Sequence, residues 1–286
     1  MTEHFKMDAP ATDRRLDDMA QGLVGAPLDR PEGTATYANE WQIEGMAHGV
    51  MVRAPGNSGR VVLSNRDEVT NMPGVLSVIQ DDRLLRNPAQ GTANKAPVQG
   101  SQHAAYLGQL IAVVVAESFE QARHAAQSLQ VTLENGEVRP VAPATAAVEP
   151  QEGQALDQGD LEGAIQNAAH SVDVVYTTPS HSSSPMEPHA SIAFWDGDDL
   201  TLHGSYQMLK YNRNELADSL GIHPDRVRIL SPYVGGGFGS KLGLAQEAVA
   251  AAIAAKELGR PVSVALQRQQ VFEATMRRSE TCQRIR

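Results

Sequence analysis

The stretch that decides the fold is Arg226-Val-Arg-Ile-Leu-Ser-Pro-Tyr-Val-Gly-Gly-Gly-Phe-Gly-Ser-Lys241, and a long alanine-rich segment follows it. An apolar run that leads into four glycines within five positions predicts a strand, a glycine loop and then a helix. Glycine adopts positive φ without strain, so the loop can expose consecutive backbone N–H groups, and the start of the helix adds partial positive charge. We expect this loop to approach an oxygen-rich or anionic ligand.

Two common phosphate loops do not fit the spacing of these glycines. A P-loop requires a glycine directly before the lysine, where this sequence has Ser240. The dinucleotide motif Gly-x-Gly-x-x-Gly needs a further glycine at Ser240 if it starts at Gly235, or at Leu242 if it starts at Gly237. The loop is therefore expected to belong to another kind of binding site.

The composition is that of a folded, acidic protein. The chain has 286 residues, 41% hydrophobic and 20% charged, and a formal net charge of −10. Nucleic acids and anionic membranes both require a basic face, which this charge disfavours. The longest apolar runs, at residues 111–116 and 248–255, are far shorter than the ~20 residues that span a bilayer. We expect a soluble chain with no nucleic-acid partner and no membrane insertion.

The N-terminus and the cysteine content limit the compartment and the redox chemistry. No basic region followed by an apolar stretch opens the chain, so no signal peptide is expected. The chain is then cytoplasmic, or periplasmic by co-export with a signal-bearing partner. Cys282 is the only cysteine, which excludes an internal disulfide, a cysteine-rich zinc site and an iron–sulfur cluster held by this chain. Any electron carriers must lie on other chains.

Hydrophobic periodicity predicts a mixture of strands and helices along the chain. Strands are expected at residues 47–53, 60–64, 75–80, 109–116, 129–133, 171–178, 191–195, 200–206, 226–234 and 262–266. Helices are expected at residues 67–71, 119–128, 160–169, 210–220 and 244–258. Ser118 and Gln121 form a capping-box signal in front of the second helix.

Short motifs stand in order on both sides of the glycine loop. They are Tyr176-Thr-Thr-Pro179, Met186-Glu-Pro-His-Ala-Ser191, Trp195-Asp-Gly197, Ser205-Tyr-Gln207, Leu220-Gly-Ile-His-Pro-Asp-Arg-Val227, Arg260-Pro-Val-Ser-Val264 and Arg277-Arg-Ser-Glu-Thr-Cys-Gln-Arg-Ile285. With these motifs the chain resembles the molybdenum-binding subunits of the xanthine dehydrogenase and aldehyde oxidase family, in which a Gly-Gly-Gly-Phe-Gly loop lies against the metal. The resemblance runs from about Gly25 onward and is nearest to the molybdenum subunits of bacterial periplasmic aldehyde oxidoreductases.

The resemblance implies an α+β fold in two parts. An α/β hammerhead domain is expected over residues 37–140, followed by the first, incomplete part of a molybdopterin-binding domain over residues 156–286. Composition adds an extended polar arm over residues 1–36 and a proline-rich linker over residues 141–155.

The resemblance also implies site residues. Gln207 stands where the family has a glutamine whose amide hydrogen-bonds an oxygen ligand of molybdenum, and the backbone of Gln207 and Met208 is expected beside the pterin cofactor. Phe238 is expected near molybdenum, as a wall of the substrate pocket. The residues of the loop against the metal are Gly235, Gly236, Gly237, Phe238 and Gly239. Without the family resemblance, Gln207 would be interpreted as a solvated polar residue. The loop would be interpreted as a tight turn with a buried phenylalanine.

Leu242 decides the expected substrate class. Purine-oxidising members of the family carry a glutamate at the matching position, whereas leucine can neither donate, accept nor ionise. An apolar pocket favours aldehydes, aromatic ones above all, over purines.

Several other residues have alternative roles. His181, Glu187 and His189 could form a metal cluster, but their segment has loop chemistry and matches a structural motif of the family. Lys241 fits a partner of a cofactor phosphate and equally a partner of an acidic neighbour. We interpret the remaining candidates as packing or surface residues, namely His203, His223 and Cys282.

The resemblance implies partners as well. Family molybdenum subunits are more than twice this length, and their second half carries most pterin contacts and a catalytic glutamate in a Gly-Val-Gly-Glu segment, which this chain lacks. The implied assembly is a molybdenum hydroxylase with a molybdopterin cofactor in the cytosine dinucleotide form, the missing C-terminal half, an iron–sulfur subunit and an FAD subunit. It would oxidise an aldehyde to a carboxylic acid with oxygen from water. We expect the chain alone to be inactive, and a non-catalytic fragment or scaffold module is the alternative.

Overall fold

The computed structural model describes residues 35–85, 100–136, 156 and 158–286. Its helices are α2 (Arg66–Thr70), α3 (Phe119–Ser128), α4 (Leu161–Asn167), α5 (Leu209–Leu220), α6 (Gln246–Leu258) and α7 (Arg268–Ala274), with short 3₁₀ turns at Ala38–Glu40, Asp82–Leu85 and Pro224–Arg226. Its strands are β1 (Ala47–Arg53), β2 (Gly59–Leu63), β3 (Val75–Ile79), β4 (His103–Ala104), β5 (Leu110–Ala116), β6 (Val131–Glu134), β7 (Val174–Thr178), β8 (His181–Ser182), β9 (Ala190–Asp196), β10 (Asp199–Gly204), β11 (Val227–Leu230), β12 (Val262–Ala265), β13 (Arg277–Arg278) and β14 (Thr281–Ile285).

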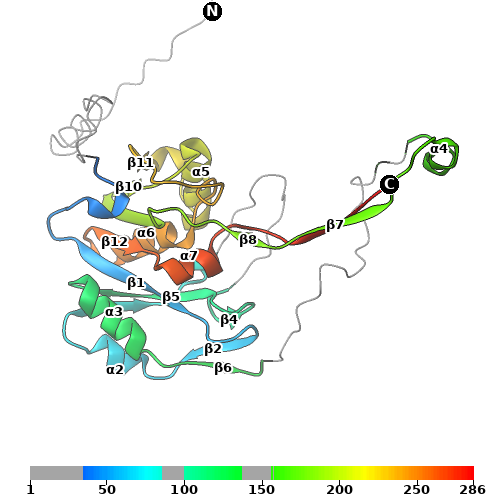
Figure 1. Cartoon of the computed structure of the whole chain (residues 1–286). Helices are drawn as coiled ribbons and strands as arrows, with labels where there is room; N and C mark the ends of the chain where they lie inside the picture. Colours follow the sequence, from blue (N-terminus) through cyan, green and yellow to red (C-terminus); the bar gives the residue numbers. More distant parts are fainter. Residues whose placement is uncertain (1–34, 86–99, 137–155, 157) are drawn as a thin grey trace, which may run out of the picture. The chain divides into compact units, whose positions relative to one another are not determined.

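A seven-stranded mixed sheet runs in the order β11-β10-β9-β12-β1-β5-β3 (Figure 1). β1 runs parallel to β12, and β10 runs parallel to β11. The other neighbours in this sheet are antiparallel. The strands β2, β4 and β6 form a separate three-stranded sheet.

Helices cover both faces of the long sheet (Figure 1). The strand β5 is buried between them, and it is apolar at every position. Val113 and Val115 of β5 pack into the core that contains α6, whereas Ala112 and Val114 pack into the core that contains Ala125 of α3. A strand buried on both faces reads as a continuous hydrophobic run and not as an alternation. The alanines of α6 have the small volume that lets the helix lie close against β9 and β12.

The long sheet joins the two parts of the chain for which separate domains were predicted. β1, β3 and β5 come from residues 37–140, and β9 to β12 come from residues 156–286. β1 and β12 meet in the middle, with Ala47 opposite Val262. The predicted arm at residues 1–36 lies almost wholly outside the described residues, and the linker at residues 141–155 lies outside them entirely. Both stay predictions.

Most predicted elements are confirmed, often to within one or two residues. The capping box in front of α3 forms as expected, since Ser118 accepts from the backbone of Gln121 and the Gln121 side chain accepts in return. The predicted α+β class is confirmed by the mixture of sheets and helices. Within the described residues no helix combines the length and the apolar character that crossing a membrane requires.

The two elements predicted around the glycine loop are both shorter than expected. The strand expected to reach residue 234 ends at Leu230 in β11. The helix predicted to start at Leu244 starts two residues later, at Gln246 in α6, so residues 240–245 separate it from the glycines. The partial positive charge expected at the loop from the helix start stays a prediction.

Candidate functional site

The glycine loop has an unusual backbone. Gly236 and Gly239 have φ values of +93° and +91°, and Phe238 between them has φ of 53° although it is not a glycine. Left-handed backbone is costly for a bulky residue and persists only where the surroundings impose it, often at functional sites. The Phe238 side chain is 64% exposed, so burial of the ring does not explain this conformation. The alternative of a turn with a buried phenylalanine is therefore wrong.

Gln207 lies against the loop from the end of β10. A Cβ on Gly237 would lie 2.4 Å from Oε1 of Gln207, a distance that real Cβ atoms do not reach. The backbone N–H of Gln207 donates to the carbonyl of Lys241 (2.9 Å). The structure thus brings the Gln207 amide and the glycines together.

Apolar side chains surround the loop on the surface. Phe238 is joined by Leu242 (40% exposed) and Met208 (38% exposed). Leu242 is held by its backbone, because Asn212 Nδ2 donates to the carbonyl of Leu242 (2.9 Å). A hollow of about 670 Å³ lies beside the loop, and its lining includes Tyr37, Met186, Gly235, Gly236 and Phe238.

Lys241, at the end of the loop, is wholly buried and forms an ion pair with Glu187. Its Nζ lies 2.9 Å from Glu187 Oε2 and 2.9 Å from Ser205 Oγ. Burial lowers the pKa of Lys241, and the nearby carboxylate opposes that effect. Burial also opposes the ionisation of Glu187, but hydrogen bonds from Ser205, Lys241 and the Gly235 N–H outweigh it and lower the pKa of that carboxyl. The structure therefore shows Lys241 as the partner of an acidic neighbour, which is one of the two roles that the sequence left open.

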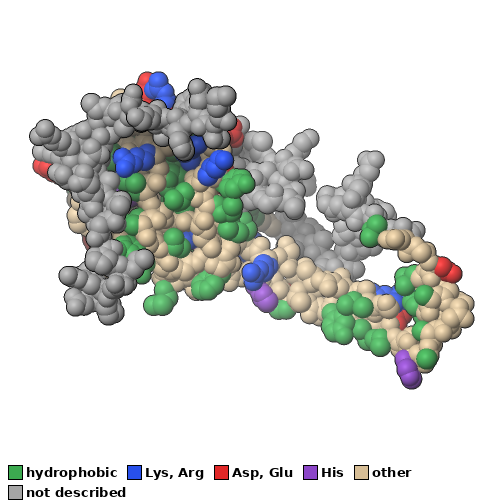
Figure 2. All heavy atoms as spheres, turned by 90° about the horizontal axis from the view of Figure 1, so that it is seen from above, with side chains coloured by type: hydrophobic (Ala, Val, Ile, Leu, Met, Phe, Trp, Pro, Cys, Tyr) green, Lys and Arg blue, Asp and Glu red, His purple; other side chains and the backbone are tan. Residues whose placement is uncertain are grey.

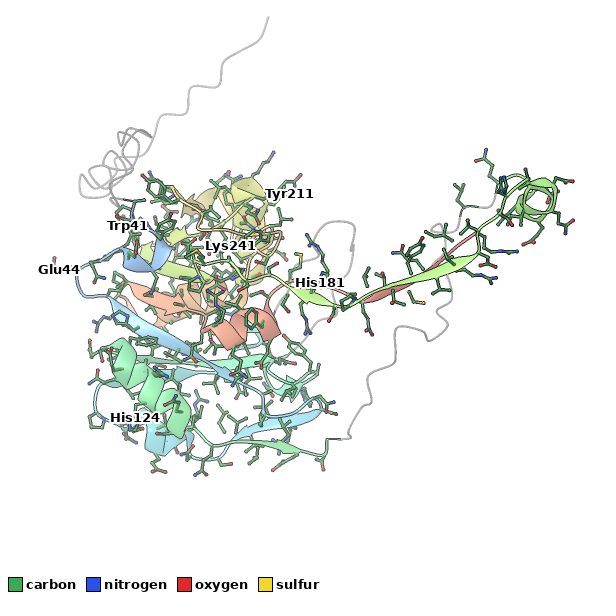
Figure 3. All side chains as sticks on the ribbon, in the orientation of Figure 1. Trp41, Glu44, His124, His181, Tyr211 and Lys241 are labelled. Carbon is green, nitrogen blue, oxygen red and sulfur yellow. The ribbon has the colours of Figure 1, made fainter. Side chains whose placement is uncertain are left out.

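The possible metal cluster does not assemble. Glu187 is bound to Lys241, while His189 is buried and its Nε2 donates to the carbonyl of Ser240 (3.0 Å). Burial lowers the pKa of His189 to about 4. His181 lies on β8, which pairs with β13 in a two-stranded sheet, and it is exposed (Figure 3). Among the described residues, no three or more histidine, cysteine or acidic side chains converge as metal ligands.

A second buried polar group lies at the start of α6. Ser191 Oγ lies 2.5 Å from Tyr206 Oη and donates to Glu247 Oε1 (3.3 Å). Burial raises the pKa of Glu247 to about 7. Neither this group nor the Glu187–Lys241 pair was predicted, because their members lie far apart in the sequence. The sequence offered one signal for the ion pair, namely the lysine at position 241 directly after the glycine-rich loop.

The whole described part of the chain has relatives. Residues 142–286 match the molybdopterin cofactor-binding domain family, and residues 32–137 match the a/b hammerhead domain of aldehyde oxidase and xanthine dehydrogenase. The aldehyde oxidoreductase molybdenum-binding subunit PaoC of Escherichia coli K12 is 40% identical over 293 residues, which cover 99% of this chain and 40% of PaoC. The chain thus spans well under half the length of this relative.

Solved structures agree on the fold. Aldehyde oxidoreductase from Desulfovibrio gigas superposes with a TM-score of 0.66 at 26% identity, covering 84% of this chain and 29% of that one. Quinoline 2-oxidoreductase from Pseudomonas putida 86 has a TM-score of 0.71 at 24% identity, over 91% of this chain and 35% of that one, and shows the fold alone. The matched domains, in the predicted order, place this chain: it belongs to the xanthine dehydrogenase and aldehyde oxidase family and is homologous to its molybdenum-binding subunits.

Proposed function

We propose that this chain is part of a molybdenum hydroxylase that oxidises an aldehyde to a carboxylic acid with oxygen from water. The observation that carries the proposal is the exposed Phe238 held at φ of 53° on a glycine loop against which the Gln207 amide lies at Gly237. Such strain at a solvent-facing loop is typical of a ligand site. The 40% identity with an aldehyde oxidoreductase subunit supports the same class.

The residues of the loop fit the molybdenum–molybdopterin cofactor. The exposed amide of Gln207 and the loop backbone at residues 236–239 offer neutral donors, which suit the oxygen atoms around a metal held by an organic cofactor. The backbone at Met208 would lie beside the pterin, and Phe238 and Leu242 would wall the substrate pocket. We propose the cytosine dinucleotide form of the cofactor.

When bound, the cofactor supplies the redox chemistry, and this chain orients it. Gln207 and the loop would hold its position, and the apolar surface of Phe238 and Leu242 would exclude water from the substrate. The described carboxylates nearest to the loop are engaged, since Glu187 binds Lys241 and Glu215 accepts from the Leu244 N–H (2.8 Å). We propose, as the family resemblance implies, that the general base lies outside this chain and that iron–sulfur and FAD partners carry the electrons onward.

The experiment compares Gln207→Ala with the wild type in the full protein that carries this chain. Gln127→Ala, exposed on α3, is the matched control. Molybdenum content and aldehyde-dependent reduction of a dye are measured. We expect about one molybdenum per wild-type protein, and a loss of about 10- to 100-fold in kcat/KM for Gln207→Ala, because one oriented donor is removed. A wild type with neither molybdenum nor aldehyde turnover, or equal losses in both variants, would refute the proposal.

A further inference from the structure

One carboxylate closes the glycine loop at both ends. Oε2 of Glu187 accepts from the backbone N–H of Gly235 (2.7 Å) at the start of the loop and from Nζ of Lys241 (2.9 Å) at its end. The backbone of Glu187 adds to both contacts, because its N–H donates to the Gly235 carbonyl (3.1 Å) and its carbonyl accepts from Lys241 Nζ (3.1 Å). The loop ends are thus tied to a single residue.

This ion pair is buried, and Glu247 and Arg268 are further charged groups that act on Lys241. The side chains of Lys241 and Glu187 are 0% and 8% exposed, and Ser205 completes the group by donating to Glu187 Oε2 (2.5 Å). Removing two charges from water offsets most of their attraction, so a buried pair is weak evidence for net stability. A role in fixing one geometry is the better account of this pair.

The geometry that the pair fixes is the one that forms the site. Between Gly235 and Lys241 the chain holds Phe238 at φ of 53°, which requires an outside constraint. The carbonyl of Lys241 also accepts from the N–H of Gln207 (2.9 Å). A Cβ on Gly235 would lie 2.4 Å from Cβ of Glu187, so the loop start packs directly on the carboxylate stem. Displacing either charged residue therefore disturbs both the loop and Gln207.

We infer that Glu187 and Lys241 are positioning residues, which together hold residues 235–241 in the conformation that presents Phe238 and Gln207 on one face. The part of this inference that concerns the cofactor rests on the proposed function. The part that concerns the loop stands on the contacts alone.

The test uses Glu187→Leu, Lys241→Met and the double variant in the full protein. Hydrogen exchange of the amides is followed by mass spectrometry in residues 207 and 235–241, with β5 as the internal reference, and the thermal unfolding midpoint is measured in parallel. Glu117→Gln is the matched control, because Glu117 pairs with Arg260 (2.9 Å) on the exposed surface away from the loop.

Each single variant leaves one charge buried and unpaired, so the midpoint falls and exchange in the loop should rise at least about tenfold. The double variant carries two apolar side chains, so its midpoint should recover while exchange in the loop stays fast. This divergence separates positioning from stability. Unchanged loop exchange in the single variants, equal acceleration in β5, or recovery of both readouts in the double variant would overturn the inference.

Molybdenum content connects the inference to the proposed function. It should fall in the double variant, which keeps its stability, and stay unchanged in Glu117→Gln. If the wild type holds no molybdenum, the proposed function fails, and the exchange data still decide whether the pair holds the loop.

Discussion

Leu242 is the residue on which the substrate class depends. It is 40% exposed beside the glycine loop, and its backbone is held by Asn212. Leu242→Glu should place a carboxyl group in an apolar pocket, where burial raises its pKa and an aromatic aldehyde loses an apolar contact. The loss should be on the order of 1–3 kcal/mol in transition-state binding, or roughly 10- to 100-fold in kcat/KM for a benzaldehyde-like substrate.

Acetaldehyde-like substrates reach less of that wall and should lose less. Steady-state kinetics on both substrates in the full protein decide the matter. Equal losses, or no loss on either substrate, would mean that Leu242 does not line the pocket and that the aldehyde assignment loses its support from the sequence.

His203 is the residue from which we expect sensitivity to acid. It is 1% exposed, its ring lies 5.4 Å from that of Trp41, and neither ring nitrogen has a hydrogen-bond partner among the described residues. Burial lowers its pKa from 6.5 to about 4. The unfolded chain therefore takes up the proton first, so the free energy of unfolding should fall as the pH falls from 6.5 to about 4.

His203→Leu should remove this part of the pH dependence, which is on the order of 1–3 kcal/mol. Urea unfolding at several pH values measures it, with the exposed His124→Gln on α3 as control. An unfolding free energy with the same slope in wild type and His203→Leu would contradict the expectation.

The sequence predicted some residues of the candidate site and missed the pairing of others for a physical reason. The glycines and Gln207 were found from an ordered series of motifs, and the interpretation of His203 as a packing residue is confirmed by its burial. Glu187 and Lys241 were each noticed without their pairing, because 54 positions separate them and no local pattern records a tertiary contact. Whether the residues of the site hold a cofactor stays a prediction.

Single elements were predicted well wherever a local signal was strong. α3 has its capping box and occupies the predicted range, and β5 was visible as an unbroken apolar run. α6 was predicted to start too early because alanine and leucine favour a helix at residues 244 and 245 as well. There the fold instead uses the Leu244 N–H to bind Glu215 (2.8 Å), so a tertiary contact overrides propensity.

Glu247, near the start of α6, carries a carboxyl group whose ionisation should lower the free energy of unfolding. Glu247 is 1% exposed, and burial raises its pKa from 4.5 to about 7. The unfolded chain releases this proton first, so the free energy of unfolding should fall as the pH rises from 4.5 to about 7 and then level off. Glu247→Gln removes the charge and keeps the shape of the side chain.

We expect Glu247→Gln to be more stable than the wild type by on the order of 1–3 kcal/mol at about pH 8, and the difference to vanish below about pH 4.5. Glu257→Gln, exposed near the other end of α6, is the control. Chemical unfolding at both pH values measures the difference. A variant that is less stable at both values would show that the ionised carboxylate supports the fold.

For the whole molecule, the pairing of strands could not be predicted from the sequence. Each strand of the long sheet was expected, yet nothing local indicated that β1 would lie parallel to β12, more than 200 positions away, and so join the two predicted domains. Apolar patterning specifies which face of a strand is buried and leaves its neighbours open. The family resemblance, and not periodicity, supplied the order of domains.

The ribbon of β7 and β14 leaves apolar side chains on the surface (Figure 2). Val174 pairs with Ile285 and Tyr176 with Gln283, so these four share one face of the ribbon, where Tyr176 is 56% and Ile285 53% exposed. A two-stranded sheet with an apolar face and unpaired edges is a template for association. We therefore expect the 286-residue chain, expressed alone, to self-associate through this face.

Tyr176→Lys should shift the chain towards the monomer, because it places a charge in the middle of the apolar face. Thr177→Lys adds the same charge to the opposite face, which carries Val175 but already holds the charge of Arg284, and should weaken association less. Sedimentation velocity over a range of concentrations distinguishes the two variants, since charge alone would act equally in both. If both lysines weaken association to the same extent, general repulsion and not the apolar face controls it, and a wild-type chain that remains monomeric throughout would remove the basis of the expectation.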